Sequence, residues 1–178
     1  MHILNISTER LQIRILMMED KKDFFSYRSL PEVYKYQSWQ PKDIKESEDF
    51  INKNDVSNLN IPNKWLQLAI CLKTKQLIGD IGIHFLEDKL QVEIGYTLSP
   101  LYQGKGYAIE AVKSVVNYLF IQLQKHRIIA SVDPDNIKSI KLLEKLGLRK
   151  EAHFIKSFQI GDKWYDDCIY AILEEEWT

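Results

Sequence analysis

Alternation of hydrophobic and polar residues predicts seven β-strands along the chain. Apolar side chains recur at about every second position, or continue as a short buried run, which is typical of strands with one or both faces covered. Polar turns at 73–76 and 161–162 would join two pairs of strands as antiparallel hairpins. The expected strands span residues 10–16, 65–72, 77–86, 91–98, 126–132, 148–158 and 163–173.

Hydrophobic residues spaced three and four apart predict four helices between these strands. The clearest pattern runs from 106 to 123, and a shorter one spans 136–146, where Gly147 ends the helix. Helices at 18–28 and 44–56 would pack on the sheet or face a substrate groove. Without internal repeats or a linker-like change in composition, residues 1–178 are expected to form one mixed α/β domain.

Charge and composition narrow the function. The 24 Lys and Arg residues against 25 Asp and Glu give a net charge of -1, which disfavours nucleic acid and anionic lipid as partners. With no signal-peptide pattern and no apolar run of about 18 residues, we expect a cytoplasmic protein that does not enter a membrane. Cys71 and Cys168 fall in strand-like segments and are expected to be buried, reduced thiols. The histidines lack the spacing of a metal site, so no metal is expected.

Residues 98–108 carry the clearest chemical signal. Gly104 and Gly106 would let backbone N–H groups approach a ligand, and the helix that follows offers unpaired amides and a positive dipole end. This pattern favours a phosphate-bearing cofactor, although an ordinary loop before a helix remains an alternative. A dinucleotide fingerprint would need glycine where Ile109 stands, and no phosphate-loop Gly-Lys-Ser/Thr is present. Gly95, within a strand, indicates a bulge or a close backbone approach.

The same segment resembles a known family. Residues 103–108 read Gln-Gly-Lys-Gly-Tyr-Ala and match the pattern Gln/Arg-x-x-Gly-x-Gly/Ala of the GNAT superfamily of acetyltransferases. With Glu110 and Ala111 they resemble its RimJ/RimL branch of N-terminal protein acetyltransferases. Further matching segments are Thr8–Leu11, Glu93–Tyr96, Asn136 with Ser139, and Glu144–Gly147. The resemblance extends over nearly the whole chain.

The resemblance implies a mostly antiparallel seven-stranded sheet, splayed between its fourth and fifth strands, with about four helices around it. Acetyl-CoA would lie in the gap. Asn136 would hydrogen-bond the pantetheine arm, although it could equally serve as a helix N-cap. Backbone groups of Tyr96, Thr97 and Leu98 would pair with that arm, and the pyrophosphate would be held by amides of Gln103, Gly104, Lys105, Gly106, Tyr107 and Ala108.

Direct acetyl transfer needs a neutral amine, a donor to the thioester oxygen and an acid for the departing thiolate. A backbone N–H near residues 96–98 is the expected oxygen donor. Glu93 is the candidate base, or else an outward, solvated strand residue. Many relatives place a tyrosine acid where Leu143 stands, so Ser139 becomes the candidate donor, or else a local backbone partner. Further candidates are Tyr102, Tyr107 and Tyr165.

The acceptor is expected to be a peptide N-terminus, a polyamine, an aminoglycoside or another small amine. Asp166, beside Tyr165, resembles a family acid that faces the acceptor and would suit a cation; the alternative is an edge charge that opposes aggregation. A homodimer is compatible with the resemblance. Two other functions fit the residues: a non-catalytic acyl-CoA sensor, which Leu143 favours, and a nucleotide-binding regulatory domain.

Overall fold

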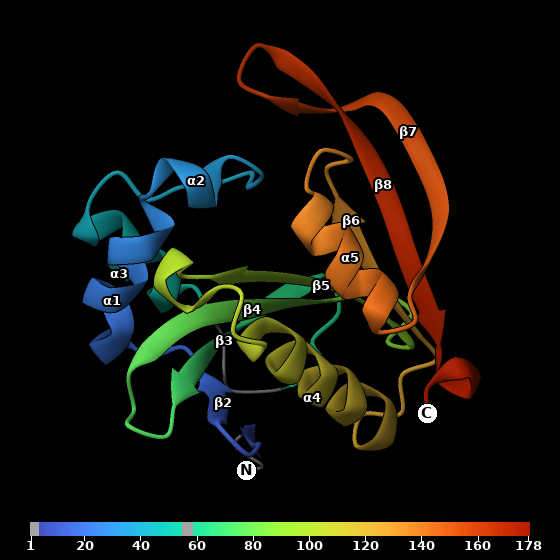
Figure 1. The fold of residues 1–178 in the computed structure, drawn as a ribbon, viewed down its shortest axis with the longest axis horizontal. Helices are drawn as coiled ribbons and strands as arrows, with labels where there is room; N and C mark the ends of the chain where they lie inside the picture. Colours follow the sequence, from blue (N-terminus) through green and yellow to red (C-terminus); the bar gives the residue numbers. More distant parts are fainter. Residues whose placement is uncertain (1–3, 55–58) are drawn as a thin grey trace.

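One mixed sheet organises the structure (Figure 1). The computed structural model describes residues 4–54 and 59–178. Within these residues eight strands lie in the order β1-β2-β3-β4-β5-β6-β8-β7, and only β5 and β6 are parallel neighbours. The predicted α/β fold is confirmed, with a strand in each expected segment. The strands are β1 (Asn5–Ser7), β2 (Leu11–Ile15), β3 (Lys64–Leu72), β4 (Leu77–Phe85), β5 (Gln91–Leu98), β6 (Arg127–Val132), β7 (Arg149–Ile160) and β8 (Lys163–Leu173).

Strand β1 was not predicted. It pairs with β2 at one edge of the sheet through Ile6 and its two neighbours. Three residues are too few to show an alternating pattern, so the strand exists because the edge of β2 offers partners.

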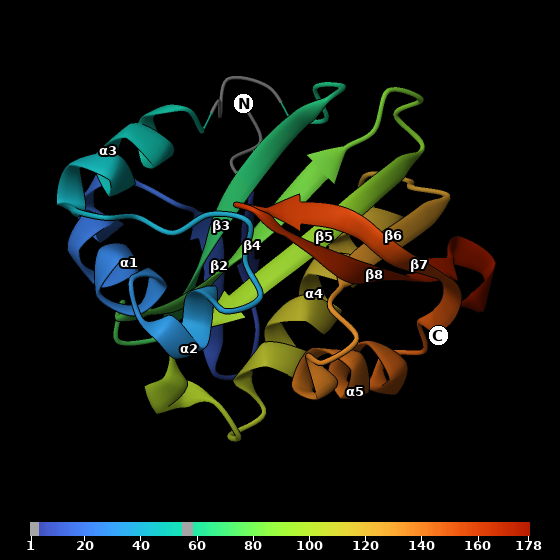
Figure 2. The same cartoon turned by 90° about the horizontal axis from the view of Figure 1, so that it is seen from above.

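Helices cover both faces of the sheet. They are α1 (Lys21–Arg28), α2 (Pro31–Tyr34), α3 (Ile44–Asn52), α4 (Tyr107–Ile121) and α5 (Ile137–Lys145). Figures 1 and 2 show α4 and α5 on the side of the sheet away from α1, α2 and α3. No helix in the described parts of the chain is both long and apolar enough to cross a membrane.

The N-terminal helices differ from their predictions. The expected helix 18–28 begins as a 3-10 turn over 18–20 before α1. The four-residue α2 was missed because it is too short for a periodic pattern; Pro31 stands at its first position, where the fixed φ of proline favours a helix start. Helix α3 ends at Asn52, and residues 55–56 of the predicted helix lie outside the described residues.

Each face of the sheet has its own hydrophobic cluster. The larger one joins α4, through Val112, Val115 and Leu119, to the strands. The smaller one packs Phe24 of α1 and Ile51 of α3 on the other face, against residues of β3 and β4. Both cysteines are buried and free, which confirms the expectation of reduced thiols.

The parallel pair β5 and β6 separates soon after it begins. Register partners run only from Gln91–Arg127 to Glu93–Ile129, although β5 continues to Leu98. The splay implied by the family resemblance is therefore present, and it leaves one edge of β5 without a strand beside it. On its other edge β5 keeps an unbroken antiparallel register with β4, in which Gly95 opposes Gly82. Of the two alternatives for Gly95, the bulge is thus wrong, and the close backbone approach stays a prediction.

A buried carboxylate ties α1 to the sheet. Asp80 of β4 is fully buried and accepts hydrogen bonds from the Tyr27 hydroxyl at 2.6 Å and from Arg28 Nε at 3.1 Å. Gln67 of β3 donates to the same carboxylate. Because Arg28 is itself only 8% exposed, its charge depends on Asp80 for compensation. The network fixes α1, and the start of α2 after it, above β4.

Asp80→Ala is expected to lower the free energy of unfolding by about 3–5 kcal/mol, because it leaves the Arg28 guanidinium buried without a counter-charge. Urea denaturation followed by circular dichroism would measure this. Asp49→Ala is the control, since Asp49 pairs with Lys45 on the exposed surface of α3 and should contribute little. Equal, small losses in both variants would show that Arg28 gains solvent at little cost.

Candidate active site

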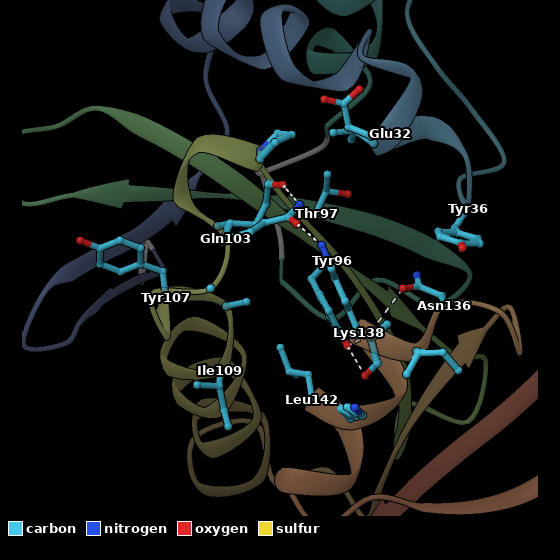
Figure 3. Close-up of a pocket in the computed structure, with 18 of the residues that line it drawn as sticks. Glu32, Tyr36, Tyr96, Thr97, Gln103, Tyr107, Ile109, Asn136, Lys138 and Leu142 are labelled. Atoms are coloured by element: carbon cyan, nitrogen blue, oxygen red, sulfur yellow. Dashed lines mark hydrogen bonds between the residues drawn. The ribbon is translucent and has the colours of Figure 1, made fainter.

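A cavity of about 1020 Å³ lies where β5 and β6 separate. Its walls come from the end of β5, the loop before α4, the start of α5, and α2 with the residues that follow it (Figure 3). Four distant segments of the sequence therefore meet here. The predicted cofactor residues that line the cavity are Tyr96, Thr97, Leu98, Gln103, Gly104, Gly106, Tyr107, Ala108, Asn136 and Ser139. Lys105 belongs to the same loop, but its side chain folds back to the carbonyl of Leu101 at 2.9 Å.

The loop before α4 has the conformation of an anion-binding loop. Gly104 and Gly106 have φ of 74° and 82°, a left-handed conformation that side chains with a Cβ rarely adopt. Gly106 is the N-cap of the 15-residue α4 and supplies no side chain to its amides. The first-turn N–H groups and the positive end of the helix dipole therefore remain available at the cavity wall.

Arg10, immediately before β2, holds this loop in place. Its Nη1 donates to the carbonyl oxygen of Lys105 at 2.9 Å, and its Nε donates to Glu110 Oε2 at 2.7 Å. The Thr8 hydroxyl also donates to Glu110, at 2.6 Å. Burial raises the pKa of Glu110, but the hydrogen bonds from Thr8 and Arg10 outweigh it and lower the pKa overall. The role of Arg10 was missed, although it belongs to the matching segment Thr8–Leu11.

The exposed edge of β5 provides further polar groups. Beyond Glu93 the strand has β4 on one side and the cavity on the other, so backbone groups on that edge can pair with a ligand, although the carbonyl of Leu98 already accepts from Gln103 Nε2 at 3.0 Å. Thr97 is only 7% exposed, and its Oγ1 has no hydrogen-bond partner among residues 4–54 and 59–178. A buried hydroxyl without a partner costs about 1–3 kcal/mol, which favours a ligand that supplies one.

Asn136 caps α5 and also lines the cavity. Its side-chain oxygen accepts a hydrogen bond from the backbone N–H of Ser139 at 3.3 Å, so the N-cap role is present. Tyr36, which follows α2 and also lines the cavity, donates to the carbonyl of Asp135 at 3.2 Å. The cap and a contact with pantetheine are compatible, because one carboxamide has both an oxygen and an NH₂ group.

Tyr96 and Ser139 form a hydrogen-bonded pair in the cavity. The Tyr96 hydroxyl lies 2.7 Å from Ser139 Oγ and donates to the Ser139 carbonyl at 3.2 Å. Burial raises the pKa of Tyr96 to about 12, so the phenol keeps its proton. Leu143 is fully buried in the core and takes no part. The sequence predicted a cofactor contact for the backbone of Tyr96 and none for its side chain. The signal for the side chain is its position: in a strand it shares one face with the core residues Val92 and Ile94, where a hydroxyl is unusual.

Glu93 lies on the opposite side of β5 from Tyr96, outside the cavity. Its Oε2 is 3.6 Å from Nδ1 of His84, whose ring stacks on Trp65 with centroids 4.9 Å apart. Burial raises the pKa of Glu93, the neighbouring His84 lowers it, and the charge of Asp167 raises it further. The carboxyl is therefore a half-buried group with a raised pKa rather than a solvated surface residue, as a general base requires.

The predicted acceptor residues lie on the hairpin of β7 and β8, away from the cavity. Asp166 Oδ2 is 2.8 Å from His153 Nε2, and its Oδ1 accepts from the backbone N–H of Lys156 at 2.9 Å. These contacts, first that of Lys156, lower the pKa of Asp166. Asp167 turns to the other face, where it accepts from the Ser131 hydroxyl at 2.7 Å and acts on Glu93. Tyr165 alternates with Asp166 and so shares the side of Asp167.

Comparison with known proteins agrees with this geometry. The chain resembles the uncharacterised N-acetyltransferase YnaD of Bacillus subtilis (strain 168), with 36% identity over 98% of this chain and 100% of that protein. The ribosomal protein uS5-alanine N-acetyltransferase of Escherichia coli (strain K12) is 33% identical over 48% of this chain and 44% of its own length. That likeness covers less than half of either chain, so it agrees with the family and does not confirm the RimJ/RimL branch.

Solved structures show the same fold. An acetyltransferase of the GNAT family from Bacillus anthracis superposes with a TM-score of 0.86, at 33% identity over 97% of this chain and 100% of that one. Spermidine N-acetyltransferase from Vibrio cholerae, in complex with CoA and spermine, gives 0.81 at 23% identity over 95% and 98%. Residues 10–149 match the family described as acetyltransferase (GNAT) domain. The splayed sheet and the glycine loop agree with this match, and the chain belongs to the GNAT family of acetyltransferases.

Proposed function

We propose that this acetyltransferase transfers the acetyl group of acetyl-CoA directly to a primary amine. The observation that carries the proposal is the cavity at the splay, where an anion cradle, an open strand edge and the Tyr96–Ser139 pair meet. The structure of the Vibrio cholerae neighbour holds CoA and spermine, which supports a CoA thioester as acetyl donor and an amine as acceptor. Membership of a family of acetyltransferases argues against a non-catalytic sensor and against a nucleotide-binding regulatory domain.

The cofactor residues divide the long CoA molecule between them. Amides of residues 103–108 would hold the pyrophosphate at the start of α4, and the open edge of β5 would pair with the pantetheine arm. Asn136 would add a side-chain hydrogen bond. Lysines gather around the same cavity and would complement the phosphates: Lys35, Lys138, Lys141 and Lys145. No metal is required by any of these contacts.

The chemistry follows from the two sides of β5. Bound acetyl-CoA supplies a thioester, and an N–H on the open edge of β5 would donate to its carbonyl oxygen. Glu93 accepts the proton that the amine loses as its nitrogen bonds to the acetyl carbon. Ser139, oriented by Tyr96, gives a proton to the sulfur as the carbon–sulfur bond breaks, and regains one from solvent. The acceptor class at this level remains a peptide N-terminus or a small amine.

Ala108→Glu is expected to weaken CoA binding at least about tenfold, because a carboxylate one residue into α4 repels a pyrophosphate there. The fold should persist, since an acidic residue in the first turn of a helix is stabilising. Isothermal titration with CoA would measure the affinity. Ala108→Gln has nearly the same size without the charge and should bind close to normally; equal binding by both variants would place the pyrophosphate elsewhere.

Glu93→Gln is expected to lower kcat/KM by about 10²–10⁴ by removing the general base. Because burial raises the pKa of Glu93, the wild-type rate should fall as pH drops through a value above that of an ordinary carboxyl, and this limb should vanish in the variant. The pH dependence of kcat/KM is the measurement. Glu87→Gln, in the exposed turn after β4, is the matched control. An unchanged rate and profile in Glu93→Gln would dismiss the base.

Ser139→Ala is expected to reduce kcat by about 10–100-fold, with little change in KM for acetyl-CoA, because the thiolate then lacks its proton donor. Tyr96→Phe should cost less, and the double variant should be no slower than Ser139→Ala if the two hydroxyls act as one unit. Steady-state thiol release measures all three. Tyr118→Phe, outside the cavity on α4, should keep normal kcat. Additive losses would show that Tyr96 acts independently of Ser139.

A further inference from the structure

The face of the sheet that carries Glu93 has an open floor beside the cavity. Gly95 and Gly82 oppose each other across β5 and β4, and nothing lies within 4 Å of where a Cβ would stand on Gly95. A Cβ on Gly82 would lie 3.1 Å from the ring of Trp65, so this indole rests across that part of the floor. Gly95 therefore leaves room for a ligand between Glu93 and Thr97.

An aromatic wall borders this floor. Trp65 is 49% exposed although it stacks on His84, so much of the indole still faces solvent. On the other side stands the β7–β8 hairpin, which rises from the sheet in Figure 1 and passes over β4 and β5 in the view of Figure 2. Phe154 of this hairpin is half exposed and lies directly opposite Asp167. Such faces suit alkyl chains and cations alike.

The charge of this face is negative. Glu93 and Asp167 come from β5 and β8, and Asp167 is near enough to raise the pKa of Glu93. Within residues 4–54 and 59–178, no Lys or Arg forms a salt bridge with either carboxylate. Arg127, at the start of β6, is bound to Glu151 instead. Two neighbouring carboxylates, neither of which forms a salt bridge with a Lys or Arg of the described residues, favour a cationic ligand.

An independent observation also points to a ligand at this place. Thr97 follows Gly95 on the same side of β5, lines the cavity, and keeps its buried Oγ1 without a partner. It therefore lies where the open face and the cofactor cavity meet. A nitrogen that enters from the Glu93 side could satisfy this hydroxyl as it reaches the cavity.

We propose that this face, formed by Trp65, Glu93, Gly95, Thr97 and Asp167, binds the acceptor, and that the acceptor is an aliphatic amine with a second cationic nitrogen. The reacting nitrogen lies near Glu93 and Thr97. Asp167 and Trp65 hold the second one. Glu93 loses its negative charge when it takes up the proton of the reacting amine. Asp167 keeps its charge and can balance that of the second nitrogen. The inference rests on the proposed acetyl transfer and names the substrate class of that site.

The neighbouring carboxylates Asp166 and Asp167 provide a test of the proposed acceptor site. Spermidine is compared with n-butylamine and with a peptide that begins with alanine, in a thiol-release assay at saturating acetyl-CoA. The wild type should favour spermidine over n-butylamine by at least about 30-fold in kcat/KM, and added salt should reduce this preference. Asp167→Asn should raise KM for spermidine about tenfold at nearly constant kcat, and should change kcat/KM for n-butylamine much less. Asp166→Asn, whose carboxylate binds His153 on the other face, should leave KM unchanged.

Several results would overturn the inference. These are equal effects of Asp167→Asn and Asp166→Asn, a preference for the peptide, or turnover of n-butylamine as efficient as that of spermidine. Each of them leaves acetyl transfer itself in place. Absence of thiol release with every amine would instead overturn the acetyl transfer on which the inference rests. Circular dichroism of both variants shows whether the fold is retained.

Discussion

The early end of pairing between β5 and β6 is the constraint on which the site depends. Backbone N–H and C=O groups need partners, and after Glu93 one edge of β5 has none in the sheet. The gap does not close, because β5 is held by seven register partners in β4 and β6 by six in β8. Antiparallel pairing on both sides thus keeps open a parallel pair that would otherwise continue.

Strand β5 also separates the two proposed proton transfers. Successive residues of a strand point to opposite faces, so Tyr96 turns toward α5 and Ser139 while Glu93 turns toward Trp65 and His84. Glu93, the proposed base, and Tyr96, which orients the proposed acid Ser139, are therefore close in sequence, yet their side chains lie on opposite sides of one backbone. A reacting amine and a departing thiol can be served at the same time without the two groups exchanging protons directly.

Part of this arrangement was predictable from sequence, because it is local. The two glycines, the start of α4 and the periodicity of that helix are set by neighbouring residues. The Tyr96–Ser139 contact joins residues 43 positions apart and depends on where α5 packs. The distinction between Asp166 and Asp167 depends on which face each strand residue takes. Pairing of β7 with β8 shifts register twice, so resemblance to a motif could not decide it.

Arg10 gives the loop before α4, the proposed pyrophosphate site, its shape without a ligand. It binds the carbonyl of Lys105, and because the peptide bond from Lys105 to Gly106 is trans, the Gly106 N–H of the same peptide unit points away from Arg10. The Arg10 guanidinium, outside the cavity, thereby orients the Gly106 N–H by binding the carbonyl at the other end of the same peptide unit. The entropy of ordering two glycines is lost during folding rather than on binding, so the loop is preorganised for its ligand.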